Sequence, residues 1–170
     1  MAAICAGIAR GPSMTGVEQA SGHRRPRQEQ LEHWRAFLRA HAYVISRLEA
    51  DLVADDQPSL ATYDVLVQLV EAPGRRLRMT ELADAVLLSR SGLTRLVDRM
   101  VSQGYVRREP SPGDARGVYA VGTDLGVATL RRASRTHLRG IGEHVVDLLS
   151  ADELEGLGRA CRKLVPDPGH

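Results

Sequence analysis

Two helix start signals lie close together in the middle of the chain, and their spacing constrains the fold more than any other feature of the sequence. Thr80 can cap a short helix over residues 81–86, because its hydroxyl can accept a hydrogen bond from the free amides of a first helical turn. Ser89 can cap a second helix over residues 90–101 in the same way, and Gly104 suits the left-handed position that closes a helix. The sequence therefore predicts a helix-turn-helix.

A hairpin is expected directly after the second helix. Residues 105–109 and 117–121 are strand-like, and Ser111-Pro-Gly-Asp114 between them has strong turn chemistry. A hairpin at this place is the wing of a winged helix-turn-helix. The predicted fold class is mainly α with a small β-hairpin wing.

The chain on both sides of this segment is organised differently. Residues 1–30 lack any sustained period and predict a flexible N-terminal tail, whereas an apolar stripe predicts a long amphipathic helix within residues 31–57. Pro58 suits the first turn of the helix that opens the winged lobe, residues 58–122. Two further helices are expected within residues 123–165.

Capping signals also mark those last two helices. Thr123 can cap the first of them, which is expected to continue to Leu149, and Ser150 with Glu153 forms a capping box for the second. These helices and the long one before the lobe carry apolar stripes that a small winged lobe cannot bury alone. We therefore expect the first and last helices to form a dimer interface.

Composition sets the class of protein and its compartment. The 170 residues suit one domain, and the two cysteines, Cys5 and Cys161, offer neither a disulfide framework nor a CxxC metal pair. The N-terminus lacks the basic region of a signal peptide, and no segment reaches the length of a membrane span. The sequence predicts a soluble cytoplasmic protein without membrane partners.

The net charge of +2 conceals an uneven distribution. Residues 75–119 carry nine arginines and five acidic residues, a local charge of +4, and the remainder of the chain carries −2. Arginine can bind phosphate or guanine through two hydrogen bonds, and a basic patch on a winged helix is the electrostatic footprint of a DNA-binding protein. The predicted partner is therefore double-stranded DNA.

Position within the motif predicts individual roles. The first turns of a recognition helix face base edges, helix N-termini and basic side chains face phosphates, and a wing tip reaches a neighbouring minor groove. Gly92 would leave room for close approach of the DNA. The candidate DNA-binding residues are Arg75, Arg76, Thr80, Ser89, Arg90, Ser91, Thr94, Arg95, Arg99, Asp114 and Arg116.

The motifs of this segment resemble the MarR family of bacterial transcription regulators. The resemblance is carried by Met79-Thr-Glu-Leu-Ala-Asp-Ala-Val, by Leu88-Ser-Arg-Ser-Gly-Leu-Thr-Arg-Leu-Val-Asp-Arg-Met, and by Asp114-Ala-Arg116-Gly. It implies a homodimer that reads a near-palindromic operator, a repressor in most cases, with DNA affinity modulated by a small ligand. The glycines at 126, 140, 142, 156 and 158 depart from smooth helices.

The resemblance also implies an effector pocket between the dimer helices and the winged lobe. Its candidate residues are Trp34, Phe37, His41 and Asp64, and a small aromatic or acidic compound would suit them. Trp34 and Phe37 also fit a purely structural place in the core.

Several other chemistries lack support in the sequence. No HExxH, P-loop or Ser/His/Asp pattern occurs, so an enzyme is not predicted, and no cofactor is expected. His137 and His144 lie two helical turns apart without a clear third ligand, so no metal site is predicted. Cys161 has basic neighbours in sequence, and oxidation or pairing with Cys5 stays open. The alternative function is a winged-helix module that binds protein without sequence-specific DNA binding.

Overall fold

The structure, a computed structural model, describes residues 25–86, 88–111 and 114–165, of which residues 114–116 are described by their backbone alone. The chain divides into two compact units, Met1–Ala36 and Phe37–His170. The described part of the first unit is the exposed start of helix α1 (Gln28–Ala54). This helix begins inside the predicted tail, three residues earlier than its apolar stripe indicated.

The second unit contains a winged helix-turn-helix. Its helices are α2 (Leu60–Glu71), α3 (Met79–Ala85) and α4 (Arg90–Ser102), and Ser59, not Pro58, precedes α2 as its N-cap. Ser59 Oγ accepts a hydrogen bond from Thr62 N at 3.4 Å. The predicted fold class is confirmed, and Pro58 lies one residue before the cap rather than in the first turn.

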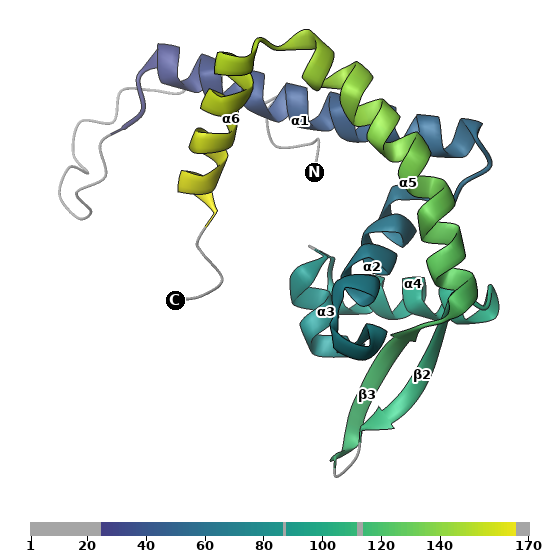
Figure 1. Ribbon diagram of the computed structural model, residues 1–170. Helices are drawn as coiled ribbons and strands as arrows, with labels where there is room; N and C mark the ends of the chain where they lie inside the picture. Colours follow the sequence, from purple (N-terminus) through teal and green to yellow (C-terminus); the bar gives the residue numbers. More distant parts are fainter. Residues whose placement is uncertain (1–24, 87, 112–113, 166–170) are drawn as a thin grey trace, which may run out of the picture. The chain divides into compact units, whose positions relative to one another are not determined.

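The wing is a three-stranded antiparallel sheet with the strand order β1-β3-β2. The hairpin strands β2 (Val106–Ser111) and β3 (Asp114–Gly122) project beyond the helices of the lobe (Figure 1). Strand β1 (Arg76–Arg78) follows the 3₁₀ turn Pro73–Arg75 and pairs with β3, with Leu77 opposite Ala120. The sequence analysis missed β1, because three residues are too few for a period and only the partner strand makes them a strand.

Helix α3 begins differently from the prediction. Its N-cap is Arg78, one residue before the helix, whereas Thr80 lies inside the first turn. Glu81 supplies the capping contact, since its carboxylate accepts a hydrogen bond from Arg78 N at 2.8 Å. The prediction of a Thr80 cap was therefore wrong, because the carboxylate side of a capping box satisfies the helix start here.

Helix α5 (Asp124–His144) ends five residues before the predicted Leu149. Thr123 caps it as predicted, with Oγ1 accepting from Gly126 N at 3.0 Å. Val145 leaves the helical region with φ −136° and ψ −60°, and a 3₁₀ turn, η2 (Val146–Leu148), follows. The glycines Gly140 and Gly142 and the two consecutive β-branched residues Val145 and Val146 have low helix propensity, which accounts for the early end of α5.

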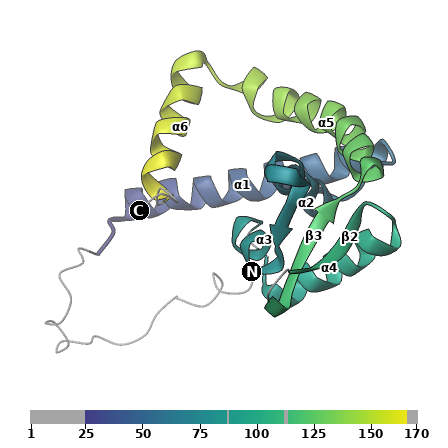
Figure 2. The same cartoon turned by 60° about the horizontal axis from the view of Figure 1, so that its bottom comes forward.

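Helix α6 (Ala151–Leu164) turns away from the axis of α5 (Figure 2). The predicted capping box is confirmed: Ser150 Oγ accepts from Glu153 N at 3.3 Å, and the Glu153 carboxylate accepts from Ser150 N at 2.9 Å. The hydrogen bonds that the Glu153 carboxylate accepts from the Ser150 backbone N and then from the Ser150 hydroxyl lower the pKa of Glu153. The cap thus fixes the start of α6 by local contacts alone.

A single apolar core joins the lobe to the neighbouring helices. Its buried side chains come from α1 to α5 and from the sheet, and include Leu48, Leu52, Leu66, Leu69, Leu82, Leu93, Val97, Met100, Val106, Ala120, Leu130 and Ala133. The second half of α1 and the first half of α5 are therefore anchored to the winged lobe. In the described residues, no helix is both long and apolar enough to cross a membrane.

Candidate nucleic-acid interface

Helix α4 has two opposite faces. Leu93, Leu96, Val97 and Met100 are buried in the core, while Arg90, Ser91, Thr94 and Arg95 are exposed on the other side. This division follows from the helical period of the sequence and fixes the helix by its apolar side. The exposed face brings together four of the predicted base-contacting side chains.

Both ends of α4 are held by local contacts. Ser89 Oγ accepts from Gly92 N at 3.1 Å, which confirms the predicted cap. At the other end, Gly104 has φ +75°, and Tyr105 N donates to the Met100 carbonyl at 2.9 Å. These contacts form a Schellman motif, which stops the helix at a defined residue.

The structure gives a second reason for a glycine at position 92, in addition to the predicted close approach of DNA. A Cβ at this position would lie 3.0 Å from Ser89 Oγ, tighter than almost all real contacts of this kind. A larger residue would push against the capping hydroxyl itself.

Thr94 already forms one side-chain hydrogen bond. Its Oγ1 donates to the Arg90 carbonyl at 2.9 Å, and the lone pairs of this oxygen remain available to accept a hydrogen bond.

An ion pair connects the wing to the recognition helix. Arg108 Nη2 of β2 lies 2.8 Å from Asp98 Oδ1 of α4, and Arg107 pairs with Glu109 within β2 at 2.7 Å. Asp114 and Arg116, the predicted wing-tip contacts, have their backbone in β3, and their side chains lie outside the described residues. The hairpin is thus joined to α4 by charge as well as by the core.

Two neighbouring arginines, Arg75 at the end of the 3₁₀ turn and Arg76 at the start of β1, have different partners. Arg75 Nη1 forms an ion pair with Asp124 Oδ1 at 2.8 Å, at the start of α5. Arg76 instead stacks on Tyr119 of β3, with its guanidinium carbon 4.1 Å from the ring centroid. Both were predicted as DNA-binding residues, and the structure engages Arg75 with a carboxylate and Arg76 with an aromatic ring.

Arg78 joins the same aromatic ring. Its guanidinium carbon lies 5.5 Å from the centroid of Tyr119, and hydrogen bonds from Arg78 and then Arg76 lower the pKa of the Tyr119 phenol. The sequence analysis missed Arg78 and Tyr119 as a unit. The alternation Arg-Leu-Arg over residues 76–78 was the available signal, because it places both arginines on one face of a strand.

A small hollow of about 280 Å³ lies between α3, α4 and the sheet. Its lining includes Thr80, Thr94, Arg78 and Arg108. The structure therefore brings the predicted residues Thr80 and Thr94 to one place, together with two arginines that the prediction left out.

Three arginines of α4 carry charge that no described acidic side chain offsets. In the part of the chain that the structure describes, no ion pair engages Arg90, Arg95 or Arg99, and all three are exposed. Arg99 lies in the last turn of α4, away from the cap. The uncompensated positive charge of the described lobe is thus concentrated on its recognition helix.

The predicted effector residues are distributed over separate places. Phe37 and His41 line an apolar hollow of about 400 Å³ with residues of α5, η2 and α6, among them Leu157 and Cys161. Trp34 belongs to the first unit and is 52% exposed. Asp64 is absent from the lining of this hollow.

Asp64 lies instead beside His137 of α5. Burial raises the pKa of Asp64 and lowers the pKa of His137, and the attraction between the two groups opposes both shifts. The His137 ring contacts Tyr63 with centroids 4.4 Å apart, and its Nδ1 has no hydrogen-bond partner among the described residues. The sequence analysis considered His137 only as a metal ligand.

No cluster of three metal-binding side chains occurs within residues 25–86, 88–111 and 114–165. His144 is separated from His137 in its contacts, because its Nε2 lies 2.7 Å from Asp51 Oδ2 of α1. Cys161 is a free, half-buried thiol, and Cys5 lies outside the described residues. Pairing of the two cysteines stays untested.

Comparison with known proteins shows where this arrangement recurs. The model of the MarR family matches residues 57–117. The multiple antibiotic resistance protein MarR of Escherichia coli strain K12 is 31% identical over 86 residues, which are 51% of this chain and 60% of that protein. The chain thus spans about 60% of the length of that curated relative.

Two solved structures extend the similarity beyond the lobe. Sco3205, a MarR family transcriptional regulator from Streptomyces coelicolor in complex with DNA, is 35% identical with a TM-score of 0.78, covering 85% of this chain and 91% of that one. A cysteine-to-serine mutant of MarR from E. coli complexed with operator DNA is 27% identical with a TM-score of 0.71, covering 81% and 96%. Because the identity with Sco3205 runs through nearly all of that regulator, this chain belongs to the MarR family of transcriptional regulators.

Proposed function

We propose that this protein is a homodimeric, sequence-specific DNA-binding transcription regulator that acts as a repressor and whose DNA affinity is modulated by a small ligand. The carrying observation is the exposed face of α4, on which Arg90, Arg95 and Arg99 lack acidic partners among the described residues. The named relatives Sco3205 and E. coli MarR were solved with DNA, which supports the same partner for this chain.

Specific roles follow from the position of each side chain on the lobe. The first turns of α4 present Arg90, Ser91, Thr94 and Arg95 to base edges in a major groove, where arginine can pair with guanine. Arg76, stacked on Tyr119, is assigned to phosphate contacts. Arg116 is assigned to the minor groove beside the wing tip, with Asp114 orienting it.

The dimer is supported by apolar surface outside the core. Large apolar side chains are exposed along α1, α5, η2 and α6, including Leu38, Ile45, Leu138, Leu148 and Leu164. A monomer rarely leaves so much apolar surface in water, so a second copy of the chain is the proposed cover. Two lobes related by a two-fold axis would read a palindromic operator.

Ligand modulation is supported by the surroundings of the effector candidates. Phe37 and His41 line an apolar hollow, whereas Trp34 and Asp64 are absent from its lining and carry no part of this proposal. Apolar walls with a few polar groups suit a small aromatic or acidic compound.

DNA binding is tested by fluorescence anisotropy with the duplex upstream of the protein's own coding region. Tight binding that weakens steeply with salt is expected, and Arg95→Ala is expected to weaken it by about 1–3 kcal/mol, the usual contribution of a base-contacting arginine. Arg135→Ala, an exposed arginine of α5 outside the lobe, is the matched control and should bind normally. Equal affinity for a shuffled duplex at physiological salt would contradict sequence-specific recognition and favour the protein-binding alternative.

A further inference from the structure

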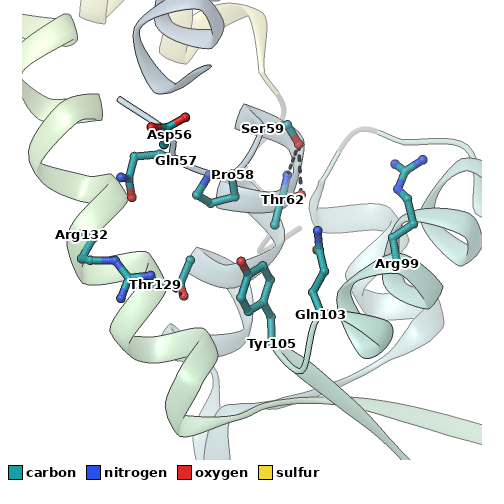
Figure 3. A pocket seen from close by; sticks show the side chains of 10 residues that line it. All are labelled: Asp56, Gln57, Pro58, Ser59, Thr62, Arg99, Gln103, Tyr105, Thr129 and Arg132. Atoms are coloured by element: carbon teal, nitrogen blue, oxygen red, sulfur yellow. Dashed lines mark hydrogen bonds between the residues drawn. The ribbon is translucent and has the colours of Figure 1, made fainter. Parts of the chain in front are cut away.

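A polar hollow of about 510 Å³ lies on the winged lobe, apart from the apolar hollow of Phe37 and His41. Figure 3 shows its lining, which comes from three places far apart in sequence: the connection between α1 and α2, the end of α4 with Tyr105, and helix α5. Its volume falls within the range of roughly 300–1,000 Å³ that is typical of small-molecule sites. None of the residues considered as effector contacts lines it.

Two guanidinium groups give this hollow its charge. Arg99 of α4 and Arg132 of α5 both line it, and within the described residues neither forms an ion pair. Arg75, Arg107, Arg108, Arg139 and Arg159 do form such pairs. Asp56 is the single acidic residue of the lining, so the hollow carries a net charge of +1.

Hydroxyl groups supply most of its remaining polar surface. Thr129 is 1% exposed, and its Oγ1 accepts a hydrogen bond from Arg132 Nη2 at 3.2 Å, which orients that guanidinium. Thr62 is 6% exposed, and its hydroxyl oxygen lies 3.0 Å from the hydroxyl oxygen of Ser59. Hydroxyls can both donate and accept, so they match the hydroxyl groups of a ligand.

We propose that this hollow binds a small hydroxylated oxyanion, a sugar-like compound that carries a phosphate or carboxylate. Arg132 binds the acidic group through charge-assisted hydrogen bonds, and Thr129, Thr62 and Ser59 bind the hydroxyls, while Arg99 adds positive charge at the opposite end of the lining (Figure 3). The polar lining disfavours an aromatic acid, for which the apolar hollow is the better match. The ligand would link the last turn of α4 to α5 and to the start of α2.

The binding step does not depend on DNA, so it is measured on the free, full-length protein. Isothermal titration calorimetry at low salt compares glucose 6-phosphate, citrate, inorganic phosphate and glucose. Glucose 6-phosphate or citrate is expected to bind, and the one that binds more tightly identifies the phosphate or the carboxylate as the recognised group. Glucose should not bind, because it lacks the charge that the arginines require.

Variants locate the bound compound. Arg132→Gln is expected to weaken binding about tenfold or more, since it removes a charge-assisted hydrogen bond. Arg99→Gln should weaken binding less, because Arg99 lies at the opposite end of the lining (Figure 3). Thr129→Val, which keeps the side-chain shape, should weaken glucose 6-phosphate or citrate, and inorganic phosphate as well, because it also removes the hydrogen bond that orients Arg132. The matched control is Arg131→Gln, the exposed neighbour of Arg132 that does not line the hollow, and it should bind normally.

Three results would overturn the proposal: no binding of either organic acid, equal weakening by Arg131→Gln and Arg132→Gln, or inorganic phosphate binding as tightly as glucose 6-phosphate. Circular dichroism and thermal unfolding check that each variant is folded. An effect of the bound compound on operator affinity rests on the proposed DNA-binding function and is measured separately by anisotropy. Loss of DNA binding alone therefore leaves the calorimetric result intact.

Discussion

Asp55 shows how a single residue joins distant parts of the chain. Its Oδ2 accepts hydrogen bonds from Thr136 Oγ1 at 2.6 Å and from Arg139 Nη2 at 2.9 Å, both on α5. The hydrogen bond from Thr136 and then that from Arg139 hold the pKa of the Asp55 carboxyl below its ordinary value. The charged carboxylate is therefore the form that the folded protein prefers.

This contact predicts a pH-dependent contribution to stability. A lowered pKa in the folded state means that Asp55 stabilises the protein above its unfolded pKa of about 4 and loses this effect as the pH falls through the lowered value. Asp55→Asn is expected to unfold at a lower temperature than the wild type at about pH 7, and the difference should shrink as the pH falls below about 4. Thermal unfolding followed by circular dichroism across this range measures it.

Asp56→Asn is the control, because the adjacent carboxyl has no hydrogen bond or ion pair among the described contacts. It should leave the unfolding temperature and its pH dependence nearly unchanged. A difference between wild type and Asp55→Asn that stays constant over the whole pH range would show that the carboxylate charge is not responsible.

Among single residues, the sequence predicted that the arginines of α4 are exposed, but it did not predict which other arginines form ion pairs. Periodicity alone places Arg90 and Arg95 on the face opposite Leu93 and Leu96, so no tertiary information was needed. The ion pair of Arg75 with Asp124 spans 49 positions of sequence. Such a pair depends on how the 3₁₀ turn Pro73–Arg75 meets the start of α5, which local patterns do not encode.

At the scale of the element, the glycines of α5 divide into two kinds. Gly126 is buried where a Cβ would lie 2.3 Å from the Tyr105 carbonyl oxygen, a backbone atom that cannot move aside. Gly142 has nothing within 4 Å of the same position. The first is therefore needed for the approach of the connection between α4 and β2 to α5, while the second only lowers helix propensity.

These two glycines predict opposite effects of one substitution. Gly126→Ala is expected to lower the free energy of unfolding by about 2 kcal/mol or more, because it forces the helix away from Tyr105. Gly142→Ala should raise it by roughly 0.5–1 kcal/mol, the gain in helix propensity. Urea unfolding of both variants measures the pair, and equal changes would show that contact with Tyr105 does not decide the role of Gly126.

Element boundaries were predictable where side chains cap the helix locally. Ser89, Thr123 and Ser150 each accept a hydrogen bond from an amide three positions later, so the sequence contained the whole signal. Thr80 is also of a residue type that caps helices, and yet it is not a cap, because the Glu81 carboxylate accepts the hydrogen bond from the free amide at the start of α3. Strand β1 was missed because its existence depends on pairing with β3.

At the scale of the whole molecule, the exposed apolar side chains outside the lobe predict association. Leu148 of η2 is 70% exposed, and Leu138 and Leu164 are 62% and 68% exposed. Leu148→Asp is expected to convert a dimer into a monomer while the lobe stays folded, since an uncompensated charge in an apolar interface is costly. Light scattering after size-exclusion chromatography gives the mass of each species.

Val101→Asp is the matched control, an equivalent substitution of an apolar residue that is 39% exposed on α4. It should leave the dimer intact. A wild-type protein that elutes as a monomer at micromolar concentration would contradict the proposed dimer, and with it the reading of a palindromic operator by two lobes.

Local sequence patterns specify the class of fold, the order of the helices, the hairpin and the concentration of arginines on one segment, because these depend on neighbours a few residues apart. The third strand, the partners of Arg75, Arg76 and Arg108, and the polar hollow beside Arg99 and Arg132 exist only through tertiary packing. Each of these joins residues that only the packing of separate elements brings together, and sequence spacing carries no record of such contacts.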